Sequence, residues 1–156
     1  TGVQTCALPI CEILVGGSWQ NSDTSIRQAT TTIIESGATL DASATDNGDG
    51  GTIVAWSNVS DPNSATFVYG SLFAKGGPNG GNGGRIETSG HYLDVDGISI
   101  NAGSKFGKAG LWLLDPYNIT ISSSATSGTT GTYTANASGS NVNVTNLETE
   151  IGRAHV

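Results

Sequence analysis

The sequence predicts an all-β protein, and three observations support this prediction. Charged residues make up only 12% of the 156 residues, and Gly, Ser, Thr and Asn are abundant in their place. This composition favours short strands and turns over long helices. Short apolar or alternating runs recur between clusters of Gly, Asn, Asp and Ser, which are typical of turns. Part of the sequence also repeats weakly at a constant spacing.

Eight of the short runs are expected to form strands. In chain order they are residues 13–15, 31–34, 52–56, 66–69, 92–95, 98–100, 111–114 and 119–121. The run 111–114 is apolar throughout and is followed by Asp115 and Pro116, and a proline ends strand pairing because it has no N–H group to donate. Trp112 is interpreted as a packing residue of this strand, and an exposed tryptophan that stacks on carbohydrate is the alternative.

The internal repeat predicts how the strands are arranged. One constant shift along the sequence superposes four glycine pairs and one isoleucine pair, which are Gly37 on Gly70, Gly48 on Gly81, Gly50 on Gly83, Gly51 on Gly84 and Ile53 on Ile86. A Gly-Gly turn therefore precedes a strand twice. Periods of this size are typical of solenoids, in which each coil stacks on its neighbours. We therefore expect a parallel β-helix.

The alternation in residues 93–96 fits this arrangement. Leu93 and Val95 alternate with Asp94 and Asp96. In a strand of a β-helix, every second side chain points inward and the others face water. Leu93 and Val95 are therefore predicted to be buried, and the two aspartates to lie on the wet surface.

Both ends of the chain match the translation of a common short-read sequencing adapter. The matching segments are TGVQTCALPI at residues 1–10 and IGRAHV at residues 151–156. The adapter would also overlap the codon of residue 11. We therefore expect residues 1–11 and 150–156 to be adapter translation and residues 12–149 to be the β-helix repeat region. On this interpretation neither Cys6 nor Cys11 indicates a disulfide or a metal site.

Charge and hydropathy exclude two classes of partner. The chain has 6 basic and 13 acidic residues and a net charge of −7, so it would repel a phosphate backbone. Nucleic acid is therefore not an expected partner. No run reaches the roughly 18–20 apolar residues that a membrane-spanning helix needs, and no membrane span is expected.

The glycine-rich segment 76–84 is interpreted as a flexible corner between coils, followed by strands at 85–88 and 92–96. A phosphate-binding loop does not fit, because Gly84 is followed by Arg85 and a strand instead of Lys and a helix. Calcium is a stronger alternative for the neighbouring segment, since Asp46, Asn47 and Asp49 offer hard oxygen ligands beside glycines.

Neither known calcium motif is complete. When the nonapeptide β-helix motif is read from Gly80, Arg85 stands where an aspartate is needed, and when an EF-hand is read from Thr45, Trp56 stands where the bidentate glutamate is needed. The acidic residues 46–49 are therefore interpreted as turns held by side-chain hydrogen bonds.

His91, Asp94 and Asp96 are the remaining candidates for chemistry. Two carboxylates at i and i+2 lie on one face of a strand, as an acid/base pair requires. The same pattern is equally that of a solvated strand face. We therefore assign no catalytic, cofactor-binding or metal residues. A carbohydrate-active β-helix enzyme and a calcium-stabilised passenger repeat stay open as alternatives.

Four blocks of sequence resemble one protein family. They are EILVGGSWQ at 12–20, ATLDASATDNGDGGTIVAWS at 38–57, GSLFAKGGPNGGNGGRIETSGHYLDVDG at 70–97 and GLWLLDPYNITIS at 110–122. In this order they resemble the filamentous-haemagglutinin-like adhesins of two-partner secretion, which are large bacterial surface exoproteins. The sequence departs from the family pattern at Ser18, where glycine is usual, and at Arg85, where an apolar or aromatic residue is more common.

The resemblance implies a fold, a location and partners. It implies a right-handed parallel β-helix that forms an internal or carboxy-terminal piece of an elongated shaft. Such a protein is not an enzyme and is exported through a dedicated outer-membrane β-barrel transporter. It is secreted or held at the bacterial cell surface. There it contributes to adhesion, through a receptor or glycan on a host or bacterial cell, or displays distal effector regions.

Overall fold

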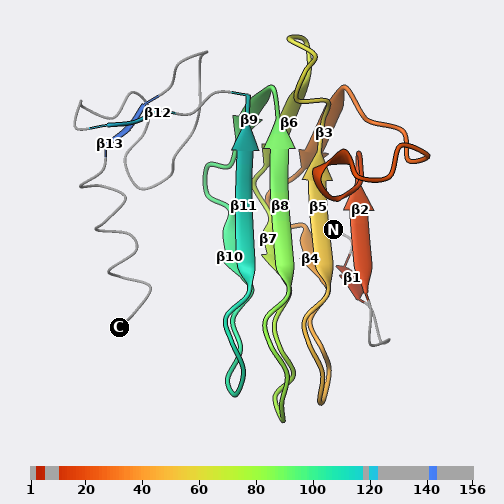
Figure 1. Ribbon diagram of the computed structural model, residues 1–156, viewed down its shortest axis with the longest axis vertical. Coiled ribbons are helices and arrows are strands. Elements are labelled where there is room, and N and C mark those ends of the chain that lie inside the picture. The colour runs from red at the N-terminus through yellow and green to blue at the C-terminus, as the bar shows by residue number, and fades with distance from the viewer. Residues whose placement is uncertain (1–2, 6–10, 118–119, 123–140, 144–156) are drawn as a thin grey trace.

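The computed structural model describes residues 3–5, 11–117, 120–122 and 141–143 of the chain. Within them the chain forms strands in parallel sheets and one short 3-10 helix, η1 (Trp19–Asn21), which confirms the all-β prediction (Figure 1). The strands are β1 (Val3–Thr5), β2 (Glu12–Val15), β3 (Thr31–Ile34), β4 (Thr39–Asp41), β5 (Thr52–Trp56), β6 (Ala65–Val68), β7 (Ser71–Phe73), β8 (Arg85–Gly90), β9 (Tyr92–Asp94), β10 (Ser99–Asn101), β11 (Leu111–Pro116), β12 (Thr120–Ser122) and β13 (Asn141–Asn143).

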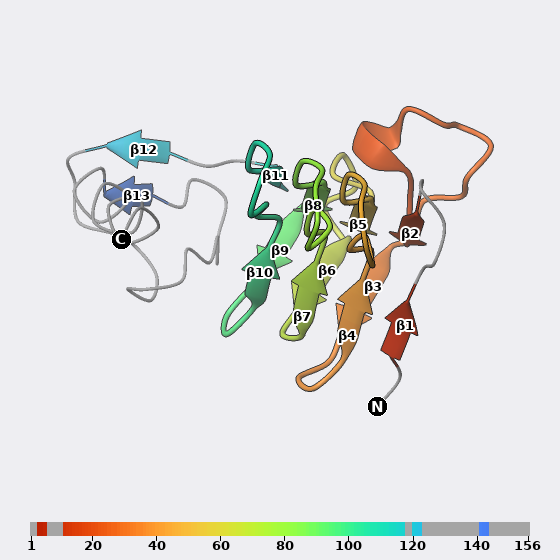
Figure 2. The same ribbon diagram turned by 90° about the horizontal axis from the view of Figure 1, so that it is seen from below.

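Three of the sheets each take every third strand of the chain. Their strand orders are β11-β8-β5-β2, β3-β6-β9 and β1-β4-β7-β10, and β12 pairs separately with β13. Figure 2 shows the three larger sheets side by side, with the chain passing from one to the next before it returns to the first. The strand pairs are parallel.

Each of the eight predicted runs overlaps a strand, and the runs 31–34 and 52–56 have the observed bounds of β3 and β5. β8 begins directly after the second Gly-Gly pair, as the repeat predicts. The eight runs did not include β4 and β7. β4 (Thr39–Asp41) contains one apolar residue, and β7 (Ser71–Phe73) follows the run 66–69 after a single glycine, so neither is visible as a separate apolar run.

The core is a ladder of inward-facing side chains from successive strands. Ile13 pairs with Ile53, and Ile53 pairs with Ile86, which is the isoleucine pair that the sequence repeat superposes. These three side chains are at most 2% exposed. Trp112 continues the ladder on β11, where it packs against the core and donates from its indole nitrogen to Thr88 Oγ1 at 3.1 Å. The interpretation of Trp112 as a packing residue is thereby confirmed.

The alternation predicted for β9 is also confirmed. Leu93 and Val95 are 2% and 1% exposed and belong to the core. Asp94 is half-buried and Asp96 is exposed. The period of two therefore identifies the inward face of this strand correctly.

Three loops project from one end of the sheets, namely residues 42–51, 74–84 and 102–110 (Figure 1). Backbone hydrogen bonds join each loop to the next, as from Gly48 N–H to Gly80 O and from Gly83 N–H to Lys108 O. A Cβ atom on Gly83 would lie 1.8 Å from Ala102 O, and one on Gly81 would lie 1.9 Å from Gly48 O. The glycine run is a corner between strands, as expected. Glycine is required there because the backbones of neighbouring loops pack closely, and not because the corner must be flexible.

The amino-terminal segment takes part in the fold. β1 pairs in parallel with β4, although the sequence of residues 1–11 matches adapter translation. Cys11 is 5% exposed, lies in the core and is disulfide-bonded, which sequence alone did not indicate. Cys6 lies outside the described residues. In the part of the chain that the structure describes, no helix has the length and apolar character needed to cross a membrane.

Candidate functional site

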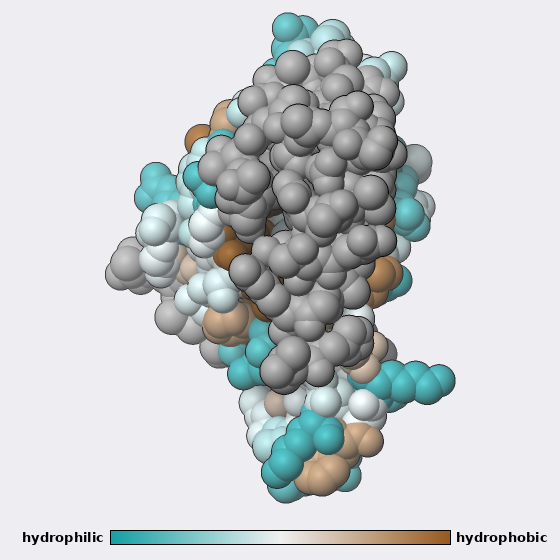
Figure 3. All heavy atoms as spheres, turned by 90° about the vertical axis from the view of Figure 1, so that its left-hand side faces the viewer, coloured by the Kyte–Doolittle hydropathy of each residue, from teal (hydrophilic) through white to brown (hydrophobic). Residues whose placement is uncertain are grey.

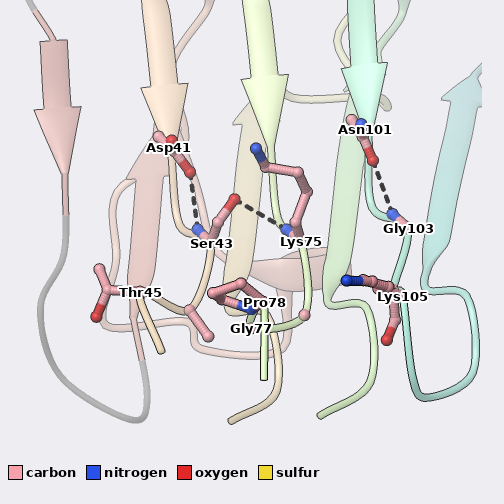
Figure 4. Close-up of a pocket in the computed structure, with 12 residues that line it drawn as sticks. Asp41, Ser43, Thr45, Lys75, Gly77, Pro78, Asn101, Gly103 and Lys105 are labelled. Atoms are coloured by element: carbon pink, nitrogen blue, oxygen red, sulfur yellow. Dashed lines mark hydrogen bonds between the residues drawn. The ribbon is translucent and has the colours of Figure 1, made fainter. Parts of the chain in front are cut away.

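An open groove of about 640 Å³ lies where β4, β7 and β10 end and their projecting loops begin (Figure 4). Polar and charged side chains from three successive strand ends and loops line it, chiefly Asp41, Ser43, Lys75, Asn101 and Lys105. The space-filling view of Figure 3 shows hydrophilic side chains, with apolar ones among them, on the loops at the lower end of the molecule. The groove can therefore accept a polar ligand from solvent.

The strand register brings the groove residues together. Asp41 pairs with Phe73, and Phe73 pairs with Asn101. Asp41 and Asn101 each end their strand with an Asx turn, because their Oδ1 atoms accept at 2.9 Å from the N–H groups of Ser43 and Gly103. One polar group of each side chain is thus used locally, and the other remains for the groove.

Two lysines contribute positive charge to the groove. The Lys75 backbone N–H donates to Ser43 Oγ at 3.0 Å, and its Nζ lies 5.4 Å from the centre of the Phe73 ring. The Lys105 Nζ lies 4.9 Å from the centre of the Phe106 ring. Both contacts are cation–π interactions, which restrain a long side chain without neutralising its charge.

His91, Asp94 and Asp96, the predicted candidates for acid/base chemistry, lie away from the groove and have local contacts. The His91 ring stacks on Tyr117 at 4.4 Å, and its Nδ1 lies 3.0 Å from Val59 O. Asp94 Oδ1 accepts from Asp96 N–H at 3.0 Å, and Asp94 Oδ2 accepts from the Tyr69 hydroxyl at 3.2 Å. Burial, with a smaller contribution from Asp94, raises the pKa of Tyr69.

The carboxylates of the candidate calcium segment connect two neighbouring loops. Asp46 Oδ1 accepts from Asn79 Nδ2 at 2.6 Å, and Asp49 Oδ1 accepts from Asn82 N–H at 2.7 Å. The turns were predicted to be held by side-chain hydrogen bonds, and these bonds run to the next loop along the chain. Within the described residues, no group of three or more His, Cys, Asp and Glu side chains is placed to hold a metal ion.

A second polar cluster lies beneath a loop of residues 16–30, here called the cap loop. The cap loop covers the outer face of β5 and β8, so that Val54 is 0% exposed although it alternates with the inward-facing Ile53 and Ala55. Trp56 Nε1 donates to Gln28 Oε1 at 3.1 Å, and the Trp19 ring stacks 4.5 Å from the Arg85 guanidinium. The cap loop is the orange segment in front of β2 and β5 in Figure 1.

Glu87 holds the cap loop from below. It is 0% exposed, and its carboxylate accepts from Gln20 N–H at 2.8 Å and from Ser89 Oγ at 2.9 Å. Burial raises the pKa of Glu87, and these two hydrogen bonds oppose part of the rise. Burial also raises the pKa of Asp115 on the neighbouring strand. Strand alternation places Glu87 on the outer face and predicts that it is exposed. This prediction is wrong, because a loop that is distant in sequence covers the side chain.

The raised pKa of Glu87 predicts a pH dependence of stability. At pH values between 4.5, the ordinary pKa of a glutamate, and the raised pKa of Glu87 in the folded protein, the folded state binds more protons than the unfolded state. The free energy of unfolding should therefore fall as pH rises through this window and then level off. In Glu87→Gln the fall should be smaller, with a remainder from Asp115, whose pKa is shifted in the same direction.

Thermal unfolding midpoints measured from pH 4.5 to 8 would test this prediction. Glu35→Gln is the matched control, because Glu35 is exposed and lies outside the cap loop. The control should keep the slope of the unaltered chain. An undiminished slope in Glu87→Gln would show that Glu87 does not cause it.

Sequence reasoning missed the lysines of the groove as well as Glu87. The repeat relates the second projecting loop to the first. In the next turn of the chain, His91 alone joins β8 to β9, whereas residues 57–64 join β5 to β6, so the constant shift of the repeat does not reach Asn101, the partner of Phe73. An alignment of the three loops at their strand ends would have placed Lys75 level with Gly103 and Lys105 two residues further along, and so both lysines at the same edge of the sheet. No protein-family model matches the chain, and no curated protein matches it either.

Proposed function

We propose that this chain is part of a large secreted bacterial surface adhesin exported by two-partner secretion, and that its strands form a right-handed parallel β-helix. The observation that carries the proposal is the stack of three parallel sheets, each taking every third strand. The blocks that resemble the adhesin family contain seven strands of this stack, namely β2, β4, β5, β7, β8, β9 and β11. Right-handedness follows from the strong preference of parallel crossover connections within one sheet.

The β-helix is proposed to act as a mechanical support and to take part in recognition of other cells. The buried ladder of Ile13, Ile53 and Ile86 runs from coil to coil, and in such a solenoid each coil contacts only its neighbours. Further coils can be added to a ladder of this kind without changing the existing ones. A long shaft built in this way would hold binding or effector regions away from the cell surface.

The proposed partners and location follow from export. An outer-membrane β-barrel transporter would bind the exoprotein during secretion, and a receptor or glycan on a host or bacterial cell would bind it at the surface. The proposed role is not catalytic. The local contacts of His91, Asp94 and Asp96 support this part of the proposal, since each of these residues stabilises a turn, a ring stack or a strand end.

The flanking DNA tests the proposal. Long-read sequencing of source DNA should find the reading frame extended at both ends, with a secretion domain upstream and a gene for an outer-membrane transporter nearby. Deletion of codons 12–149 from that longer gene should reduce adherence of the producing cells. A complete gene that encodes only this single domain would contradict the proposal.

A further inference from the structure

The groove at the ends of β4, β7 and β10 has an unusual charge for this chain. Only 6 of the 156 residues are Lys or Arg and the net charge is −7, yet two lysines line this one groove. Among the described residues the one salt bridge joins Arg85 and Glu12, at 4.0 Å, so neither Lys75 nor Lys105 is paired with a carboxylate there. Both ammonium groups are therefore available to an anionic ligand.

The two ammonium groups are positioned by the fold. Lys75 follows β7 and Lys105 follows β10, so they lie beyond the ends of adjacent strands of the same sheet. Because Phe73 pairs with Asn101, Lys75 lies level with Gly103, and Lys105 lies two residues further along its loop. The two lysines are therefore separated along the strands as well as across them, and a ligand that reaches both must be extended. The contacts with Phe73 and Phe106 restrain both side chains, and in Figure 4 both lysines belong to the lining of the same groove.

The groove also offers neutral hydrogen-bonding groups. Asn101 uses its Oδ1 atom for Gly103 N–H, and within the described residues its amide NH₂ has no hydrogen bond. Asp41 uses Oδ1 for Ser43 N–H, and its second oxygen can accept a hydroxyl proton. A ligand that fits must therefore carry hydroxyl groups as well as negative charge.

We infer that this groove binds a linear polysaccharide of uronic acids, with carboxylates of the polysaccharide on Lys75 and Lys105 and ring hydroxyls on Asp41 and Asn101. A nucleic acid fits less well, since its denser negative charge would meet the Asp41 carboxylate and the net negative charge of the chain. The inference specifies the ligand class of the proposed adhesin and rests on that function for its biological role. The binding itself does not depend on export.

Calorimetric titration of the full chain with a hexamer of 1,4-linked galacturonic acid tests this inference. The hexamer should bind, and its fully methyl-esterified form, which lacks the charge, should not. Replacing both Lys75 and Lys105 by alanine should weaken binding about tenfold, because each exposed ion pair contributes modestly. Lys108→Ala is the matched control, since Lys108 lies in the same loop as Lys105 but does not line the groove, and it should bind as before.

Several results would overturn the inference. They are absence of binding at millimolar hexamer, equal binding of the esterified form, unchanged affinity in the double variant, or tighter binding of a sulfated heparin hexasaccharide. Circular dichroism of each variant would confirm that it is folded. Absence of binding in the titration would contradict the groove inference without affecting the evidence from the flanking genes. A complete gene that encodes only this domain would contradict the adhesin proposal without affecting the titration. The failures of the two proposals are therefore distinguishable.

Discussion

Ile53→Ala is expected to lower the free energy of unfolding by about 2–5 kcal/mol. Ile53 is 0% exposed and sits in the ladder between Ile13 and Ile86. The substitution removes three buried carbon atoms from a position that is enclosed by strands on both sides. Because the neighbouring strands are fixed by their own hydrogen bonds, the cavity can collapse only in part, and the cost should lie in the upper half of this range.

Ile33→Ala is the matched control for this prediction. It makes the same change on β3, at a side chain that is 58% exposed. Its effect should stay within about 0.5 kcal/mol, as for most surface substitutions. Urea unfolding followed by circular dichroism measures both values. Equal losses of stability in the two variants would contradict the assignment of Ile53 to the core.

Much of the fold could be predicted from sequence, because the inward face of each strand depends on a local pattern. Alternation of apolar and polar residues identified Leu93 and Val95 as buried, and the internal repeat identified the pairing of Ile53 with Ile86. The short strands β4 and β7 were not among the predicted runs. β4 contains one apolar residue and β7 is separated from the preceding run by one glycine, so neither forms a distinct run, and their place in the sheet is set by neighbouring strands.

The outer face of the sheet was less predictable, because segments distant in sequence cover it. Val54 and Glu87 are both 0% exposed beneath the cap loop, although alternation places them on the outside. The two departures from the adhesin pattern meet this same loop. Ser18 Oγ accepts from Asp23 N–H at 3.0 Å inside it, and Arg85 stacks against Trp19. Both departures therefore supply contacts that hold the cap loop in its position.

The glycine-rich loops show a different limit of sequence reasoning. Their composition correctly indicated a corner between strands, and it also suggested flexibility. Backbone atoms of one loop instead lie so close to the next that side chains would collide with them. Glycine has this second role wherever two backbones approach closely. The distinction has a measurable consequence, since substitutions in a flexible corner are tolerated and substitutions in a packed corner are not.

Gly83→Ala is accordingly expected to lower the free energy of unfolding by about 3 kcal/mol, as for overpacking at a rigid site. The new Cβ would lie 1.8 Å from Ala102 O and 2.4 Å from Gly110 N. Both are backbone atoms, so the third loop would have to move as a whole. That movement would lengthen the hydrogen bond from Gly83 N–H to Lys108 O, which is 2.8 Å in the structure. Hydrogen exchange of this amide should therefore accelerate.

Gly103→Ala provides the control within the same stack of loops. Its new Cβ would have one close neighbour, the Asn101 Oδ1 atom at 3.2 Å, which belongs to a side chain and can shift by a few tenths of an ångström. The expected loss is below about 1 kcal/mol. If the loops were flexible, both substitutions would cost equally little. A loss for Gly83→Ala well above that for Gly103→Ala would therefore identify the projecting loops as a packed layer that fixes the position of the lysines in the groove.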